Sequence, residues 1–258
     1  IDALAAAVPI EGRRDPAFAA YLLALPRDND IAREIGHDID PDAIHLARAN
    51  LRDAIARKLA PILADLSPFD AAAQPYAPDA ENAGRRALRH AALFAAVAAN
   101  SDATSDQYAI QFYQRADNLS DRYAALQSLV DRNNDAHETL LAAFEQRYRN
   151  EPLALDKWFL LQACIPERDT LARVRRLMEH PAFSLTTPNR VYALIMGFAQ
   201  GNPREFHRPD GEGYAFIENL ILDIDRRNPQ VAARVATTHR MRLGLVSHVS
   251  SPLHALDS

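Results

Sequence analysis

Glycine is scarce in this sequence. Only 8 of the 258 residues are glycine, whereas alanine occurs 48 times. Alanine has the highest helix propensity of all residues, and the tight turns of β-hairpins use glycine. The composition therefore favours helices and makes a β-sandwich or β-barrel unexpected.

Cysteine, long apolar runs and an excess of positive charge are missing as well. The single cysteine, Cys164, allows neither an internal disulfide nor a cysteine-based zinc site, so we expect a cytoplasmic protein. No apolar run approaches the roughly 18 residues that span a bilayer, so no membrane partner is expected. The formal net charge of -5, without a long basic run, argues against a nucleic-acid partner. Because the chain opens at Ile1 rather than at a methionine, we expect a piece of a longer protein.

Familiar catalytic motifs are also absent. The sequence has no Gly-x-Ser-x-Gly motif, no P-loop and no Gly-x-Gly-x-x-Gly turn. His137 and Glu138 begin like the zinc motif His-Glu-x-x-His, but Leu141 stands where the second histidine is needed, and helix capping explains the pair better. We expect the histidines at the solvated surface and Cys164 in a helix core. The chain alone is therefore expected to have no catalytic residue, no metal ligand and no bound cofactor.

Apolar residues recur with a helical period along nearly the whole chain. Helix starts are predicted where proline follows a capping residue, at Asp40, Thr187 and Asn228. Gly201 is expected to end a helix in the left-handed conformation, and Pro61 to kink or end another. About a dozen helices with short loops form either a compact bundle or an α-solenoid. We favour the all-α solenoid, an armadillo- or HEAT-like superhelix of antiparallel helix pairs.

The last residues differ from the rest in composition and in periodicity. Residues 236–258 lack a clear amphipathic period and are rich in serine, threonine and histidine. We expect residues 1–235 to form a single α-solenoid domain, followed by an atypical or disordered tail over 236–258. From the residues alone, an enzyme accessory domain, a scaffold and a binding module all stay open.

Several stretches are more specific than the composition. They are LDKWFLLQA over 155–163, FAQGNP over 198–203, FHRPDGEGY over 206–214 and RNPQVAAR over 227–234. In this order and spacing they resemble the C-terminal domain of the aminopeptidase N family, which are zinc metallopeptidases of the M1 class. The resemblance covers about residues 1–235 of the chain.

The resemblance implies a role without chemistry of its own. In that family the C-terminal domain is an α-solenoid that closes over the catalytic domain, walls off a chamber and gates the access of peptides. The zinc ion belongs to the catalytic domain, so zinc is expected as the cofactor of the parent enzyme and not of this chain. The implied partners are the catalytic domain of the same protein and, through the parent, peptide substrates. The competing interpretation is a free-standing helical-repeat scaffold that binds a protein partner in its groove.

Two residues can be carried over from the family pattern. The glutamine and the arginine that match Gln230 and Arg234 line the family's substrate pocket and face its chamber. An uncharged amide suits a pocket wall that accepts varied side chains, and an arginine suits peptide carboxylates or carbonyls. Gln230 and Arg234 are therefore the candidate chamber-lining residues in the parent enzyme.

The end of the chain departs from the family pattern. The family continues into further amphipathic helices, which residues 236–258 do not match. Loss of those helices is expected to uncover Leu220, Ile221 and Ile224. Because exposed apolar patches favour association, self-association of the chain is predicted.

Overall fold

The computed structural model describes residues 1–67, 76–99, 103–130, 136–238 and 245 of the chain. The described part is helical and contains no strand, apart from one isolated parallel bridge between Ile39 and Leu245. In chain order the elements are α1 (Asp2–Arg14), α2 (Pro16–Leu22), α3 (Asp28–Ile35), α4 (Pro41–Leu66), α5 (Ala80–Ala99), α6 (Ala103–Arg115), α7 (Leu119–Val130), α8 (Ala136–Tyr148), α9 (Pro152–Ala163), α10 (Thr170–Leu177), α11 (Pro188–Val191), the π-helix η1 (Tyr192–Met196), α12 (Gly197–Gly201), α13 (Pro203–Phe206), α14 (Glu212–Asp225) and α15 (Pro229–Ala236).

The helices gather into two compact units. Unit 1 comprises residues 1–25 and 47–144, and unit 2 comprises residues 26–46 and 145–258. Of the three boundaries between the units, two fall inside α4 and α8, and the third lies between α2 and α3. The expected single domain over 1–235 stays a prediction.

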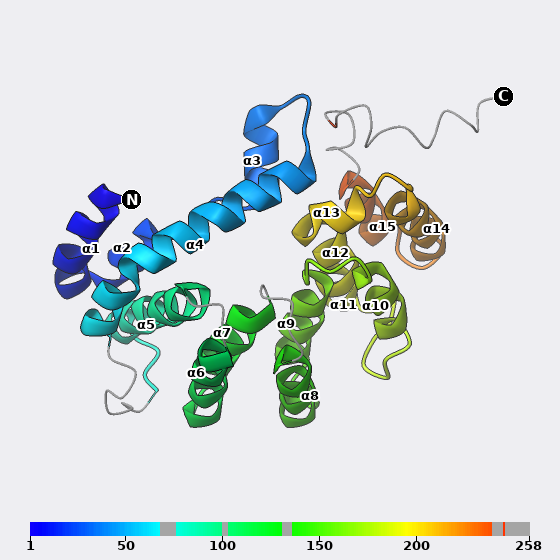
Figure 1. Ribbon diagram of the computed structural model, residues 1–258. Helices are drawn as coiled ribbons and strands as arrows, with labels where there is room; N and C mark the ends of the chain where they lie inside the picture. Colours follow the sequence, from blue (N-terminus) through cyan, green and yellow to red (C-terminus); the bar gives the residue numbers. More distant parts are fainter. Residues whose placement is uncertain (68–75, 100–102, 131–135, 239–244, 246–258) are drawn as a thin grey trace. The chain divides into compact units, whose positions relative to one another are not determined.

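Unit 1 is built from long helices around small apolar side chains. Within it α2 packs on α1 and α5, and α6 lies beside α7 (Figure 1). The centre of the α1–α2–α4–α5 core is formed by Val8, Ala19, Leu59, Leu63 and Leu88, all buried. Alanine side chains bring these helices close together, which is the physical consequence of the alanine-rich composition.

A buried carboxylate ties α5 to α7 in the same unit. Asp121 on α7 accepts hydrogen bonds from Arg89 at 2.6 Å and from the Nε2 atom of His90 at 2.7 Å, both on α5. Asn118 donates a third at 2.9 Å, while its own side-chain oxygen accepts the main-chain N–H of Asp121. Burial raises the pKa of the Asp121 carboxyl, whereas these hydrogen bonds and the nearby cations lower it. The lowering is the larger effect, so the pKa lies below the ordinary 3.8.

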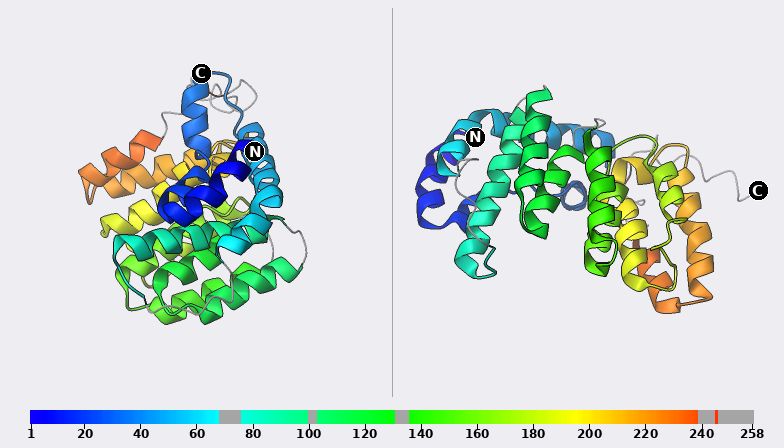
Figure 2. Two further views of the ribbon diagram at one scale, coloured as in Figure 1. Left: turned by 90° about the vertical axis from the view of Figure 1, so that its left-hand side faces the viewer. Right: turned by 90° about the horizontal axis from the view of Figure 1, so that it is seen from below.

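Unit 2 is built from shorter helices around aromatic side chains. Phe159, Phe198, Phe206 and Tyr214 are fully buried. The Phe206 ring meets those of Phe198 and Tyr214 edge-on, with centroids 6.0 and 5.1 Å apart. At the C-terminal side, α14 and α15 lie side by side (Figure 1; Figure 2). Edge-on aromatic pairs of this kind add to the stabilisation that burial alone gives.

Most helix starts lie where the sequence predicts them. Asp40 caps α4 by accepting the main-chain N–H groups of Asp42 and Ala43. Asn228 caps α15 in the same way, with Val231 as the donor. These two predictions are confirmed. Thr187 does precede α11, but its side chain makes no capping hydrogen bond.

The predicted helix ends are less accurate. Gly201 is not in the left-handed conformation; the described glycines with positive φ are Gly36 and Gly211. Gly201 is instead the last residue of α12, where a Cβ atom would overlap the sulfur of Cys164. Nor does Pro61 end its helix, since α4 continues to Leu66. The lost hydrogen bond at the proline is tolerated because the helix buries leucines on either side of it.

The expectation of an uncovered apolar face is wrong for two of its three residues. Leu220 and Ile224 are buried, on a helix that packs against α15. The apolar surface from which self-association was predicted is therefore mostly covered. Self-association of the chain stays a prediction. Beyond Ala236, Thr238 is buried and donates to the carbonyl of Val235. The rest of the tail, 239–244 and 246–258, lies outside the described residues.

Candidate functional site

The two candidate residues share one exposed face of α15. Val231, Ala232 and Val235 form the buried side of this helix, which packs on α14 and η1. Gln230 and Arg234 are exposed. Residues four apart in a helix project from the same face, so the amide and the guanidinium stand next to each other at the surface. The structure thus brings the two predicted residues together.

Tyr192 joins this face from another element. The guanidinium carbon of Arg234 lies 4.5 Å from the centre of the Tyr192 ring, which places the cation over the ring. Tyr192 is half-buried and is the first residue of the π-helix η1. The face of an aromatic ring attracts a cation placed over it. The ring therefore helps to hold the Arg234 guanidinium in place.

The π-helix itself is held by packing. Ala193, Leu194 and Ile195 are buried, and η1 packs on α9. At the end of η1, a side chain on Gly197 would collide with Leu160 of α9. A π-turn widens the helix by one residue and changes the direction of the side chains around it, and such turns are frequent at functional sites.

A buried arginine anchors the segment in front of the π-helix. The Nε and Nη1 atoms of Arg190 donate to the carbonyls of Ala182 at 2.9 Å and Pro152 at 3.0 Å. Arg190 also forms an ion pair with Asp156, and its guanidinium lies over the ring of Phe159. This network fixes the start of α11 against α9 and so fixes where Tyr192 stands. Arg190 acts on the candidate site through position, not through contact with a ligand.

Two histidines and the cysteine of the described residues have contacts with other parts of unit 2 or, in unit 1, with a neighbour in sequence. His207 and His137 are buried, contrary to the expectation of surface histidines. The Nδ1 atom of His207 lies 2.6 Å from the hydroxyl of Tyr214, and the Nε2 atom of His137 lies 3.3 Å from Glu138. Cys164 points its sulfur at the carbonyl of Gly197. Within the described residues no three histidine, cysteine or acidic side chains are grouped as a metal site.

The chemistry of the α15 face is that of binding. Gln230 offers an amide that donates and accepts, and Arg234 offers charged N–H donors suited to carbonyl or carboxylate oxygens. Neither side chain is a base or a nucleophile at neutral pH. Tyr192 could not be found from the sequence, because its contact with Arg234 comes from packing between η1 and α15 and leaves no local signal.

The chain is similar to a family model and to several known proteins. Residues 1–242 match a family model described as a domain of unknown function (DUF3458_C) with ARM repeats. The chain is 40% identical over 234 residues to aminopeptidase N of Caulobacter vibrioides, covering 91% of this chain and 27% of that protein. It is 37% identical over 232 residues to aminopeptidase N of Escherichia coli, covering 89% and 26%. The chain thus spans about a quarter of the length of these relatives.

A solved structure shares the fold. The crystal structure of Legionella pneumophila aminopeptidase A in complex with aspartic acid superimposes with a TM-score of 0.82 at 24% identity, covering 95% of this chain and 29% of that one. ARM repeats are stacked helices, so the predicted all-α solenoid is confirmed. The resemblance to the C-terminal domain of aminopeptidase N is confirmed as well. No helix among the described residues is both long and apolar enough to cross a membrane.

Proposed function

Since the chain belongs to the DUF3458_C family of ARM-repeat domains, we propose that it is the non-catalytic C-terminal domain of a zinc aminopeptidase, closing over the catalytic domain of the same protein. In this role it walls the substrate chamber and gates the access of peptides, from which the parent removes N-terminal amino acids. The observation that carries the proposal is the identity of 40% with one quarter of an aminopeptidase N over nearly all of this chain. In the parent, the zinc ion of the catalytic domain supplies an activated water.

Gln230 and Arg234 are the residues of this chain that contact peptide. The Arg234 guanidinium, stacked on Tyr192, donates to carbonyl or carboxylate oxygens of a peptide in the chamber. Gln230, one helical turn before it, presents an amide that tolerates side chains of different chemistry. A hydrogen bond to a charged group contributes about 1.5–3 kcal/mol, enough to change affinity at least about tenfold.

The test uses the full-length parent enzyme with substitutions in this domain. Arg234→Gln is expected to lower kcat/KM for peptides about tenfold, because a charged donor to the substrate is lost. A single aminoacyl amide, which offers fewer carbonyl oxygens than a peptide and no terminal carboxylate, should lose less. Arg226→Gln is the matched control, since Arg226 is an exposed arginine before α15 that pairs with Asp223 of its own helix end.

A second experiment addresses the gating role. The chain is added to the separately expressed zinc-bearing domains, and the rates of cleavage are compared for short and long peptides. A change in selectivity by peptide length supports the chamber wall. Unchanged rates on mixing, together with unchanged kinetics of Arg234→Gln, would contradict the proposal and leave the free-standing scaffold as the explanation.

A further inference from the structure

A short turn follows α10 on the way to α11. Its main chain is held by the carbonyl of His180, which accepts the N–H of Phe183 at 2.8 Å. The side chain of His180 adds a second contact, because its Nδ1 atom lies 3.1 Å from the main-chain nitrogen of Ala182. A main-chain N–H can only donate, so Nδ1 accepts here and carries no proton. The neutral ring therefore has its proton on Nε2.

The ring of His180 is placed by two helices of unit 2. Trp158 and Phe159 of α9 pack on it, with ring centroids 5.2 and 5.5 Å away. On α8, Glu145 places a carboxylate oxygen 3.8 Å from Nε2, and Glu179, the preceding residue, is exposed. The side chain of His180 is 23% exposed, so solvent reaches it. The imidazole thus has a main-chain donor at one nitrogen and a carboxylate near the other.

Protonation changes what the Nδ1 atom can do. Both nitrogens of an imidazolium are donors, so the new Nδ1–H group and the N–H of Ala182 would point at each other. The hydrogen bond between them is lost, whereas the attraction between Nε2 and Glu145 grows because the ring is now charged. Histidine is the side chain that ordinarily changes its charge between about pH 5 and 8. The ring of His180 can therefore exchange a main-chain partner for a carboxylate.

The turn is also connected to the anchor of α11. The carbonyl of Ala182, the residue whose N–H the imidazole holds, accepts the Nε–H of Arg190 at 2.9 Å. Arg190 is paired with Asp156 and lies over the ring of Phe159, and neither contact involves the turn. Movement of Ala182 therefore weakens one contact of Arg190 and leaves these others in place.

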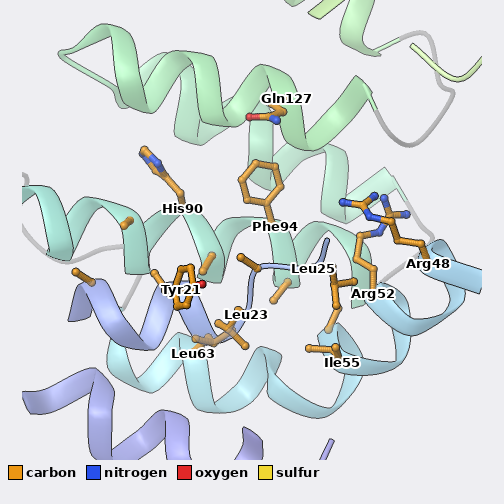
Figure 3. A pocket seen from close by; sticks show the side chains of 17 residues that line it. Tyr21, Leu23, Leu25, Arg48, Arg52, Ile55, Leu63, His90, Phe94 and Gln127 are labelled. Atoms are coloured by element: carbon orange, nitrogen blue, oxygen red, sulfur yellow. The ribbon is translucent and has the colours of Figure 1, made fainter. Parts of the chain in front are cut away.

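His90 of unit 1 has the opposite arrangement. It lines a groove bordered by α2, α4 and α5, whose walls include alanines of α2 and α5 (Figure 3). Its Nε2 atom lies 2.7 Å from a carboxylate oxygen of Asp121. A carboxylate accepts, so this nitrogen keeps its proton whether or not the ring is charged. Of these two histidines, only His180 loses a hydrogen bond when it becomes charged.

We propose that His180 is a pH-sensitive catch on the turn between α10 and α11. The neutral ring holds the N–H of Ala182 and with it the carbonyl that accepts Arg190. The charged ring pairs with Glu145 and releases the N–H, which loosens the contact of Arg190 in front of η1. The proposal does not depend on the chamber-wall function, because every contact of the catch lies within unit 2 of this chain.

Nuclear magnetic resonance of the whole chain tests the catch. At about pH 8 the chemical shifts of the ring nitrogens of His180 should place the proton on Nε2. The exchange rate of the Ala182 amide, divided by its intrinsic rate at each pH, should rise about fivefold between about pH 8 and 5, since one hydrogen bond is lost. A proton on Nδ1 at the higher pH, or an unchanged exchange rate, would overturn the proposal.

Substitutions separate the catch from a purely structural contact. His180→Asn keeps an acceptor, because an asparagine side chain bonds the main-chain N–H two residues on, and it cannot be protonated. The Ala182 amide should then be protected equally at both pH values, whereas His180→Ala should leave it unprotected at both. His37→Asn is the matched control, since His37 is 87% exposed in the same unit and the pH dependence should remain. A pH dependence that persists in His180→Asn would contradict the assignment to His180.

The charged state and the connection to α11 have tests of their own. Glu145→Gln removes the carboxylate that pairs with the charged ring, so the Ala182 amide should be released only at a lower pH. The Nε–H of Arg190 should exchange faster over the same pH range as the Ala182 amide, because its acceptor moves. Release of the amide at the same pH in Glu145→Gln would contradict the exchange of partners. Release without any change at Arg190 would contradict the connection to α11.

Discussion

The two units are built from helices of different length and from different core side chains. In unit 1, α4 and α5 have 26 and 20 residues, and both contribute alanine and leucine side chains to one buried cluster. In unit 2, α11, α12 and α13 have only 4, 5 and 4 residues, and the core around them is aromatic. Helices this short are unstable by themselves and exist because tertiary contacts hold them. Unit 2 therefore depends on individual side chains more than unit 1 does.

Buried polar groups follow the same division. In unit 2, Thr170 and Asn202 both donate to the carbonyl of Ile165, at 2.6 Å each, and Arg190 donates to two further carbonyls. Ile165 and Ala182 lie outside the helices, in the connections after α9 and before α11, and these side chains supply donors to their carbonyls. In unit 1, Asp121 joins side chains of different helices. Unit 1 also contains a hydrogen bond from a side chain to the main chain: Arg122 donates to the carbonyl of Ala116, just after the end of α6.

The largest expected effect comes from emptying the aromatic core of unit 2. Phe198→Ala should lower the free energy of unfolding by about 3–5 kcal/mol, because a fully buried ring is lost and a cavity is left. Trp158, the one tryptophan of the sequence, is buried in unit 2, so its fluorescence in a urea titration reports this unit. Leu222→Ala in the same unit is the control, since Leu222 is 63% exposed and its loss should cost well under 1 kcal/mol. Equal losses in the two variants would show that unit 2 does not depend on its buried aromatic rings.

Removing a side chain that serves main-chain carbonyls should have the next largest effect. Arg190→Met leaves the carbonyls of Ala182 and Pro152 without their donor and should cost about 2–3 kcal/mol. Arg176→Met, on the exposed side of α10, is the matched control and should stay within about 0.5 kcal/mol. The midpoint of the Trp158 fluorescence transition measures both. A loss as small as that of the control would mean that the short helices of unit 2 do not rely on Arg190.

The corresponding test in unit 1 is the carboxylate of Asp121. Asp121→Asn should cost about 1–2 kcal/mol at neutral pH, since charge-assisted hydrogen bonds from Arg89 and His90 are weakened and both donors are partly exposed. The pKa of Asp121 is lower in the folded chain than its ordinary 3.8, so its stabilising contribution is present above 3.8 and is lost as the pH falls through the folded value.

The measurement for Asp121→Asn is amide hydrogen exchange of α5 and α7 as a function of pH. The difference in exchange rate between Asp121→Asn and the unsubstituted chain should shrink in acid, because both then carry an uncharged group at this position. Asp117→Asn is the control, because Asp117 is exposed before α7 and accepts a hydrogen bond from the neighbouring Asn118. A difference that persists unchanged in acid would show that packing, and not the charge of Asp121, holds the two helices.

An element could be predicted from the sequence where the contacts that define it are local. Starts such as those at Asp40 and Asn228 are local, since the capping side chain and the capped N–H groups are three residues apart. The role of Gly201 is not local: it makes room for Cys164 of a neighbouring segment, which no pattern around the glycine reveals. The π-turn of η1 was beyond prediction for the same reason, because its register is set by packing on α9.

The candidate site divides in the same way. The shared face of Gln230 and Arg234 follows from their spacing on one helix and could be predicted. The stacking of Arg234 on Tyr192 depends on where η1 lies, and the groove of unit 1 depends on alanines contributed by separate helices. The composition shows that alanine is abundant, but it does not show which alanines remain uncovered in the folded chain.

The smallest expected effect concerns a buried carboxylate in unit 2, and its sign is opposite to that of Asp121. Burial raises the pKa of Glu205; Arg208, Arg204 and Arg168 lower it and Asp42 raises it, which leaves the pKa above the ordinary 4.5. The folded chain then holds this proton more tightly than the unfolded chain, so stability from Glu205 is greatest below 4.5 and falls as the pH rises through the folded value.

Glu205→Gln removes a charge that the fold disfavours, so it should raise the free energy of unfolding at neutral pH by up to about 1 kcal/mol. The gain should vanish below the ordinary pKa, where Glu205 is protonated in both states. Trp158 fluorescence in urea at the two pH values measures it, with Glu212→Gln at an exposed position as the control. A destabilising Glu205→Gln at neutral pH would mean that the ion pair with Arg208 outweighs burial. The two units would then treat a buried carboxylate alike, and the division between them would rest on helix length and aromatic packing alone.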